Sequence, residues 1–200
     1  MANFFRPFRK PAGLITVVSG LPRSGTSMMM KILEAAGFPI LTDNLRTADE
    51  DNPKGYFEFE QVKALKEGDR DWLKHAEGKA VKVISSLLGE LPAAYRYRII
   101  FMQREIDEIL ASQKQMLIRR GEAADGDDRS MAMNFQEHLK RVRVWLANQP
   151  NMEVHYVNYN ELMADPAPAI RAVAGFLGVE AQLPAMLAVP DKRLYRQRAS

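Results

Sequence analysis

The sequence predicts an α/β domain of three layers, in which a mainly parallel central sheet carries helices on both faces. Four short apolar runs are continuous rather than alternating, which is typical of strands that are buried on both sides. Segments with helical spacing separate these runs, and strands that alternate with helices favour parallel pairing. The chain has 200 residues and a hydrophobic content of 46%, which is enough for the core of one domain.

Four strands are predicted, at Leu14–Ser19, Ala80–Ser85, Arg98–Gln103 and Glu153–Val157. The carboxyl ends of parallel strands meet at one edge of the sheet, and ligands bind at that edge in folds of this class. Three of the four ends carry a basic or hydroxyl group that suits an anion. The residues at the ends are the loop after Ser19, Lys82 with Ser85 and Ser86, Gln103 with Arg104, and Asn158 with Tyr159.

Five helices are predicted, and glycine or cap residues bound several of them. Gly37, Gly121 and Gly178 stand where helices commonly end in a left-handed residue. Asp165 is placed to cap a helix whose first residue is Pro166, a position at which proline is tolerated. The predicted helices are Thr26–Ala36, Phe59–Ala76, Asp107–Arg120, Ser130–Asn148 and Ala167–Leu177.

Residues 13–190 are predicted to form this single domain, between a basic and aromatic tail at 1–12 and a basic tail at 191–200. No apolar run approaches the roughly 18 residues of a membrane helix. The apolar stretch after residue 12 is short and leads directly into a loop that the domain needs, which argues against a cleaved signal peptide. We therefore expect a cytoplasmic protein without a transmembrane segment.

The composition excludes several functional classes. The chain has no cysteine, which excludes disulfides, thiolate metal sites and thiol catalysis, and its three histidines are scattered. We therefore expect no bound metal. The formal net charge of +3 suits small anions but is too weak to indicate a nucleic-acid-binding surface.

The most specific motif is the loop between the first strand and the first helix. Gly20 and Gly25 have the Gly-x-x-x-x-Gly spacing of a phosphate-binding P-loop. Thr26 stands where such a loop has its lysine, and the basic residue is instead Arg23, within the loop. Glycines let backbone N–H groups approach an anion, and the helix N-terminus adds partial positive charge. We therefore expect an anion site in the segment Pro22–Ser27.

The surroundings of this loop favour an anion that is bound without a metal. ATP and GTP sites use the P-loop lysine and a strand-end aspartate that helps to hold magnesium, and neither is present here. The third strand leads instead into Arg104, and Ser112 follows eight residues later in the next helix. These two side chains are suited to a second phosphate. The alternative is a surface arginine that pairs with Glu105 or Glu108.

Four segments, taken together and in this order, resemble the sulfotransferases that use 3′-phosphoadenylyl sulfate (PAPS), in particular a short bacterial-type member. Each segment alone is a weak signal, but the resemblance extends over roughly residues 14–178. The segments are Pro22–Ser27, Ala80–Ser85 before Leu91 and Pro92, Arg104 with Ser112, and Val157–Leu162 followed by Asp165-Pro166 and Phe176–Gly178.

The resemblance implies a P-loop, sulfotransferase-like fold, with PAPS as co-substrate and adenosine 3′,5′-bisphosphate (PAP) as product. It implies that Lys82 lies near the transferred sulfuryl group, that Arg104 and Ser112 bind the 3′-phosphate, and that Tyr159 lies near the adenine. Arg23, Lys82 and the loop amides would stabilise charge on the departing bridging oxygen. The implied donor-binding residues are Pro22, Arg23, Ser24, Gly25, Thr26, Ser27, Arg104, Ser112 and Tyr159.

The chain departs from the family at the general base. Cytosolic members have a catalytic histidine shortly after the lysine, whereas Ile84–Leu87 contains none. The carboxylate candidates are Asp43, Asp49 and Glu58, because a base must reach the acceptor within hydrogen-bond distance. We favour Glu58, since Gly55–Phe57 suggests a turn with aromatic residues beside an acceptor pocket. The alternative for each candidate is a structural or solvated carboxylate.

The late Arg-Lys-Gly loop that the family places over the 3′-phosphate is also missing. Arg193, Arg196 and Arg198 could replace it, and the alternative is a basic tail without that role. His138 and His155 are interpreted as structural residues.

We therefore predict an enzyme that transfers a sulfuryl group to a hydroxyl or amine of a small-molecule, carbohydrate or peptide acceptor. Catalysis is assigned to Arg23, Lys82 and one carboxylate, either Glu58 or Asp43. Two alternatives stay open, namely a P-loop kinase that acts on a small molecule and a non-catalytic nucleotide-binding protein. The sequence indicates neither the acceptor nor the oligomeric state.

Overall fold

The computed structural model describes residues 13–43, 45, 55–123 and 126–191. The predicted tail at 1–12 and nearly all of the tail at 191–200 lie outside these residues, as do Asp49, Arg193, Arg196 and Arg198.

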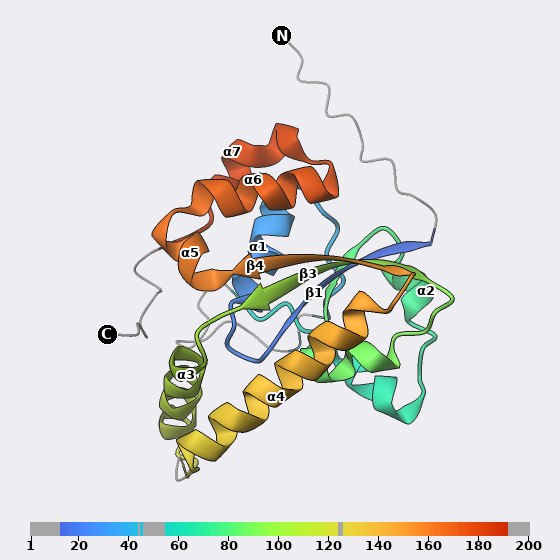
Figure 1. Ribbon diagram of the computed structural model, residues 1–200. Helices are drawn as coiled ribbons and strands as arrows, with labels where there is room; N and C mark the ends of the chain where they lie inside the picture. Colours follow the sequence, from blue (N-terminus) through green and yellow to red (C-terminus); the bar gives the residue numbers. More distant parts are fainter. Residues whose placement is uncertain (1–12, 44, 46–54, 124–125, 192–200) are drawn as a thin grey trace.

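The centre of the domain is a parallel sheet of four strands in the order β2-β1-β3-β4 (Figure 1). Its longest pairing joins β1 to β3, with a register that extends from Leu14 opposite Arg96 to Gly20 opposite Met102. The predicted strands are confirmed with small shifts, except that the second ends at Lys82 rather than Ser85. The strands are β1 (Leu14–Gly20), β2 (Ala80–Lys82), β3 (Arg96–Gln103) and β4 (Met152–Asn158).

The predicted helices occur in their predicted order with one correction, and η2, α5, η3 and α7 are additional elements that were not predicted. A single helix over Phe59–Ala76 was wrong, because Gly68 adopts φ 87° and ends a 3₁₀ segment before a short helix begins. Asp165 caps α6 as predicted, since its carboxylate accepts from the N–H of Ala167 at 3.2 Å. The elements are α1 (Thr26–Ala35), η1 (Glu60–Glu67), α2 (Leu73–Ala76), η2 (Ser85–Glu90), α3 (Ile106–Arg119), α4 (Asp128–Ala147), α5 (Tyr159–Ala164), α6 (Pro166–Leu177), η3 (Glu180–Gln182) and α7 (Leu183–Leu187).

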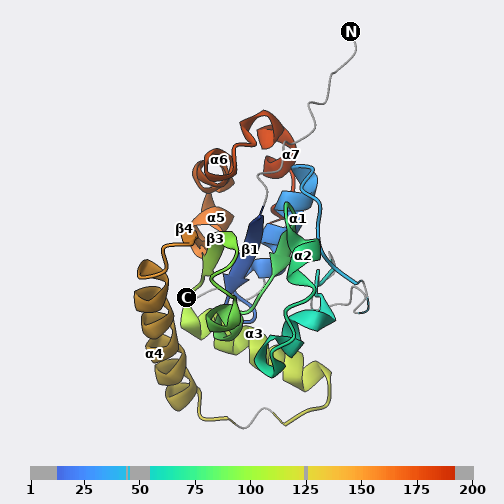
Figure 2. The same ribbon diagram turned by 90° about the vertical axis from the view of Figure 1, so that its right-hand side faces the viewer.

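The three predicted layers are confirmed, because each face of the sheet carries its own hydrophobic core. On β3, Ile100 and Met102 pack into the core under α1, α6 and α7, whereas Ile99 and Phe101 pack into the core under η1, α2, η2 and α4. In both views α6 and α7 lie together on one side of the strands and α4 lies on the other (Figures 1 and 2). This arrangement explains the continuous apolar runs of the strands.

The strand order places a topological switch point beside β1. The chain leaves β1 toward β2 on one side, whereas β3 lies against its other side. In open α/β sheets a crevice forms where the connections diverge, at the carboxyl ends of the strands. The loop after β1 and the residues after β3 therefore share one edge of the sheet.

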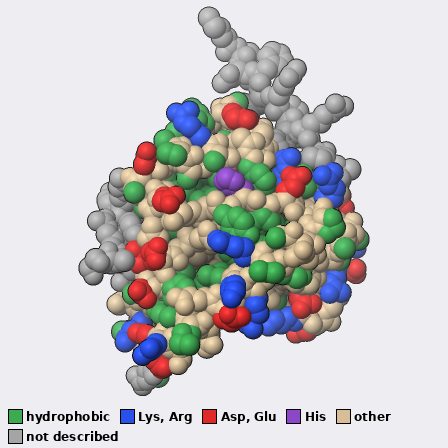
Figure 3. All heavy atoms as spheres, in the orientation of Figure 1, with side chains coloured by type: hydrophobic (Ala, Val, Ile, Leu, Met, Phe, Trp, Pro, Cys, Tyr) green, Lys and Arg blue, Asp and Glu red, His purple; other side chains and the backbone are tan. Residues whose placement is uncertain are grey.

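The outer surface carries mixed charges, with basic and acidic side chains interspersed over the face in Figure 3. No helix in the described part of the chain combines the length and the hydropathy that crossing a bilayer requires.

Candidate active site

The loop after β1 turns tightly into α1. The N–H of Ser24 donates to the carbonyl of Leu21 at 3.2 Å, and Arg23 and Gly25 adopt left-handed φ values of 70° and 97°. Pro22 is exposed on this loop. Gly25, at the N-cap of α1, has no side chain that could cap the helix. The first N–H groups of the helix, at Thr26 and beyond, are therefore oriented as an anion site requires.

Both glycines of the loop are required by close contacts as well as by their backbone angles. A Cβ at Gly25 would lie 2.4 Å from Cδ2 of Tyr159, and a Cβ at Gly20 would lie 2.5 Å from Oγ of Ser24. The hydroxyls of Ser19 and Ser24 are buried and have no hydrogen-bond partner among the described residues. The loop is thus a tightly packed turn lined by donor groups that the described protein atoms leave unsatisfied.

Arg104 connects this loop to α3 and α5. Its Nη1 donates to the backbone carbonyl of Arg23 at 3.0 Å, and its Nε donates to the Glu108 carboxylate at 2.9 Å. The guanidinium carbon lies 4.5 Å from the centre of the Tyr159 ring. The other Glu108 oxygen accepts from Nδ2 of Asn160 at 2.9 Å. The alternative pairing with Glu108 therefore does form, but between side chains that are only 7% and 2% exposed rather than at the surface.

Arg23 points toward the residue that was predicted to work with Arg104. Its Nε donates to Oγ of Ser112 at 2.9 Å, although the two residues are 89 positions apart in the chain. The structure therefore brings Arg23, Arg104 and Ser112 into one connected group at the edge of the sheet. Ser112 itself is buried.

Tyr159 is buried beneath this group. Burial is the main cause that raises the pKa of its phenol, Arg104 opposes the increase and Glu108 adds to it. Its ring fills the space beside Gly25 and under Arg104. The side chain therefore supports the loop and the arginine from below.

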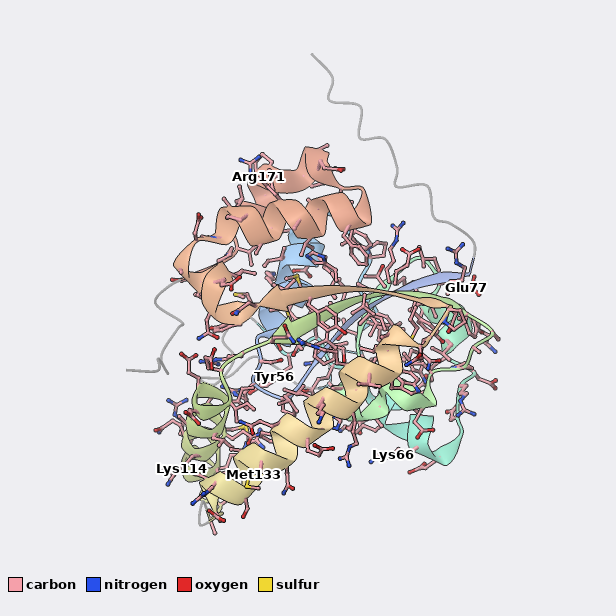
Figure 4. The ribbon with its side chains drawn as sticks, viewed as in Figure 1. Tyr56, Lys66, Glu77, Lys114, Met133 and Arg171 are labelled. Atoms are coloured by element: carbon pink, nitrogen blue, oxygen red, sulfur yellow. The ribbon has the colours of Figure 1, made fainter. Side chains whose placement is uncertain are left out.

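A second group lies on the β2 side of the loop. Nζ of Lys82 donates to the backbone carbonyl of Tyr56 and lies 3.5 Å from Oγ of Ser27 and 3.6 Å from the Glu58 carboxylate. Ser27 Oγ donates to the same Tyr56 carbonyl at 3.3 Å. The Lys82 side chain is 9% exposed and that of Glu58 is 30% exposed, so the carboxylate is the more accessible partner. Figure 4 shows Tyr56 near the loop that follows β1.

Asp43 is placed differently from Glu58. Its carboxylate accepts from the backbone N–H groups of Leu45, at 3.0 Å, and of Glu60. Its own N–H donates to the carbonyl of Glu58 at 3.3 Å, and the Thr42 hydroxyl donates to the same carbonyl at 2.8 Å. Asp43 thus fixes the backbone of the segment that presents Glu58.

Sequence reasoning missed one pair close to the lysine strand. Oγ of Ser85, at the start of η2, lies 2.8 Å from Nε2 of His138 on α4. Burial, and secondarily the charge of Arg141, lowers the pKa of this histidine. The two residues are 53 positions apart, and no local pattern in the sequence connects them.

Comparisons with known proteins identify a matching family model and solved structures with the same fold. A family model described as "Sulfotransferase family" matches residues 79–182. No curated protein matches the chain.

Several solved structures share the fold at low sequence identity. The sulfotransferase domain of the Synechococcus PCC 7002 olefin synthase has 15% identity and a TM-score of 0.51, over 99% of this chain and 88% of that domain. Retinol dehydratase in complex with androsterone and the inactive cofactor PAP has 16% identity and a TM-score of 0.52, over 90% of this chain and 65% of that one. Mouse sulfotransferase SULT7A1 complexed with PAP has 14% identity and a TM-score of 0.50, over 95% and 68%.

Proposed function

The chain belongs to the sulfotransferase family, and we propose that it transfers a sulfuryl group from PAPS to a hydroxyl or amine acceptor. The observation that carries the proposal is the connection between the two predicted anion sites. Arg104 donates to the Arg23 carbonyl within the loop, and the Arg23 side chain donates to Ser112 on α3. PAPS carries two anionic groups, a 5′-phosphosulfate and a 3′-phosphate, and a connected pair of sites suits such a ligand.

The loop is suited to the 5′-phosphosulfate. Gly20 and Gly25 allow the turn to pack closely, because a Cβ at either position would meet Ser24 or Tyr159. The buried hydroxyl of Ser24 lacks a partner among the described residues. In our proposal the loop amides, with the hydroxyls of Thr26 and Ser27 at the start of α1, hold this group.

The 3′-phosphate is assigned to Arg23 and Ser112, whose side chains meet at 2.9 Å. This assignment moves Arg23 from the sulfuryl end of the ligand, where the sequence placed it, to the opposite end. In this assignment Arg104 positions the loop and α3, because it donates to the Arg23 carbonyl and to the Glu108 carboxylate. Tyr159 acts in the same way, as a support under the loop.

The transfer chemistry is assigned to Lys82 and Glu58. When bound, PAPS supplies a sulfuryl group whose bond to the 5′-phosphate oxygen breaks as the acceptor oxygen or nitrogen forms a new bond to sulfur. Lys82 stabilises the negative charge that this phosphate oxygen gains, and such donors are commonly the largest catalytic term. Glu58 takes the acceptor proton, since its carboxylate is partly exposed beside Lys82. No step in this scheme requires a metal ion.

The acceptor class stays as broad as the sequence left it, namely a small molecule, a carbohydrate or a peptide. The cytoplasmic location likewise stays a prediction from the sequence.

Ligand binding tests the donor assignment. We expect PAP to bind more tightly than ADP and without magnesium, and to add about 2.7 kcal/mol of stability at 100 times its dissociation constant. Ser112→Ala should weaken PAP about tenfold and leave AMP, which lacks the 3′-phosphate, within twofold of the wild type. Ser86→Ala, at an exposed serine of η2, is the matched control. Stabilisation by ATP with magnesium but not by PAP would support the kinase alternative instead.

Activity tests the catalytic assignment. With PAPS and a panel of hydroxyl and amine acceptors, Lys82→Met should lower kcat by about 10²–10³, and Glu58→Gln by about 10²–10⁴. Both variants should still bind PAP. Asp43→Asn should mainly lower the free energy of unfolding and change kcat little, because the Asp43 carboxylate accepts hydrogen bonds from backbone N–H groups. Equal kcat in wild type and Glu58→Gln would remove the base role, and tight PAP binding without any transfer would favour a non-catalytic protein.

A further inference from the structure

A separate cavity of about 360 Å³ lies between the sheet and α4, with walls from β3, β4 and α4 and from Ile106 at the start of α3. Small-molecule sites commonly occupy about 300–1,000 Å³. No residue of the loop after β1 lines this cavity, and neither Lys82 nor Glu58 does. The cavity is therefore distinct from the proposed transfer site.

The floor of the cavity is apolar and partly open to solvent. The rings of Phe101 and Tyr156 lie 5.6 Å apart, and Leu139 and Val144 of α4 face the same space. Phe101 is buried, whereas Tyr156 is 36% exposed and Val144 is 59% exposed. Apolar side chains thus remain accessible at a concave site, where an apolar ligand would cover them.

The charged part of the lining is basic. Arg143 and Lys140 lie on α4, and the Arg143 guanidinium is 5.1 Å from the centre of the Tyr156 ring. No aspartate or glutamate of the described residues lines the cavity. Figure 3 shows hydrophobic side chains beside Lys and Arg side chains over β4 and the middle of α4. An apolar floor with two cations at its edge is complementary to an apolar molecule that carries one negative charge.

The cavity also lies on the opposite face of β3 from the anion group. Successive side chains of a strand point to opposite faces. Phe101 and Gln103 of β3 line the cavity, whereas Met102 packs into the core that contains Tyr159. A ligand here would contact β3 without entering the loop.

We propose that this cavity binds an amphipathic monoanion, a molecule with an apolar chain or ring and one carboxylate or sulfate group. The assignment does not depend on the transfer reaction, because it rests on different residues.

The probes are octanoate and octylammonium, which have the same chain length and opposite charge. By titration calorimetry we expect octanoate to bind about tenfold more tightly than octylammonium, since two exposed cations each contribute modestly. In NMR spectra octanoate should change the chemical shifts of the backbone amides of Gln103, Val144 and Tyr156. The amide signals of Gly20 and Gly25 should not change. Equal affinities, no octanoate binding, or shifts confined to other residues would each overturn the proposal.

Variants of α4 test the residues. Lys140→Gln with Arg143→Gln should remove the preference for octanoate. The control with the same change of net charge is Lys114→Gln with Arg171→Gln, at exposed positions of α3 and α6 that are labelled in Figure 4, and it should keep the preference. Val144→Trp, at an exposed position, should fill the cavity and weaken both probes. Melting temperatures establish that each variant is folded, and PAP binding is measured separately, so failure of the proposed function would not affect this test. Unchanged octanoate affinity in either α4 variant would contradict the assignment.

Discussion

Replacing Arg104 by methionine should lower the free energy of unfolding far more than the same replacement of an ordinary surface arginine. The guanidinium and the Glu108 carboxylate are 2.9 Å apart and are only 7% and 2% exposed. Methionine keeps much of the volume but leaves the Glu108 charge buried, where its carboxylate still accepts from Nδ2 of Asn160. Breaking a buried pair on one side costs about 3–5 kcal/mol. That is a large part of the roughly 5–15 kcal/mol by which domains are stable.

Urea unfolding at pH 7 measures this loss as a lower midpoint at an unchanged slope. Adding Glu108→Gln to Arg104→Met removes the orphaned charge, so the double variant should recover all but about 1 kcal/mol, which reflects the lost bond to the Arg23 carbonyl. The matched control is Arg96→Met. Arg96 lies 3.7 Å from Glu153 at the surface, with a side chain that is 76% exposed, and should cost less than about 1 kcal/mol.

PAP binding separates stability from the proposed positioning role of Arg104. The double variant should be nearly as stable as the wild type but bind PAP at least tenfold more weakly, because the loop has lost the donor that holds Arg23. The reasoning is refuted if Arg104→Met costs no more than Arg96→Met, or if Glu108→Gln fails to restore stability. Full PAP affinity in a folded double variant would refute the positioning role alone.

Two further predictions concern the loop and the unexpected histidine. Gly25→Ala should cost about 1–3 kcal/mol more in urea unfolding than Gly37→Ala, because both positions have left-handed φ but only at Gly25 would the new Cβ meet the Tyr159 ring; equal losses would contradict this. Burial lowers the pKa of His138, so below about pH 6.5 the unfolded chain binds a proton more readily and stability falls as the pH falls. His138→Gln, which can still bond to Ser85, should show a smaller drop in melting temperature between pH 7.5 and 5.5 than the wild type, and an identical drop would exclude a contribution from His138.

Most of the fold could be predicted because burial on two faces leaves a clear pattern in the strands. The end of β2 could not, since the apolar run continues after pairing has ended. Val83 still donates to the carbonyl of Val18 at 3.0 Å and is buried, but Ile84 is 40% exposed and Ser85 begins η2. Hydrophobicity alone does not indicate where a short edge strand leaves its neighbour.

The error over Phe59–Ala76 had a visible signal. Gly68 stands in the middle of that segment and terminates η1 in a left-handed conformation. An interior glycine lowers helix stability and is a common stop. Val62 and Leu65 are three residues apart, a spacing that suits one face of a helix, and both are buried on the 3₁₀ segment just as well.

The site was predictable where its contacts are local or belong to a motif. Arg104 and Glu108 are four residues apart on the chain, and their pairing was named as an alternative. Contacts between distant residues were not predictable in the same way. Lys82 and Glu58 were each candidates, but only the fold shows that they lie 3.6 Å apart, because pairing across elements depends on how the helices and loops pack.

The position of Arg23 explains why its side chain could not be assigned from the motif. A non-glycine residue with a φ of 70° is held in a conformation that costs roughly 1–2 kcal/mol, and such a residue persists only where its surroundings fix it. Two contacts with distant elements fix Arg23. Arg104, which directly follows β3, donates to the Arg23 carbonyl, and Ser112 of α3 accepts from the Arg23 side chain. The loop therefore owes its shape to the group proposed to bind the 3′-phosphate. A ligand phosphate that binds Arg23 and Ser112 would also stabilise the loop that holds the sulfuryl end.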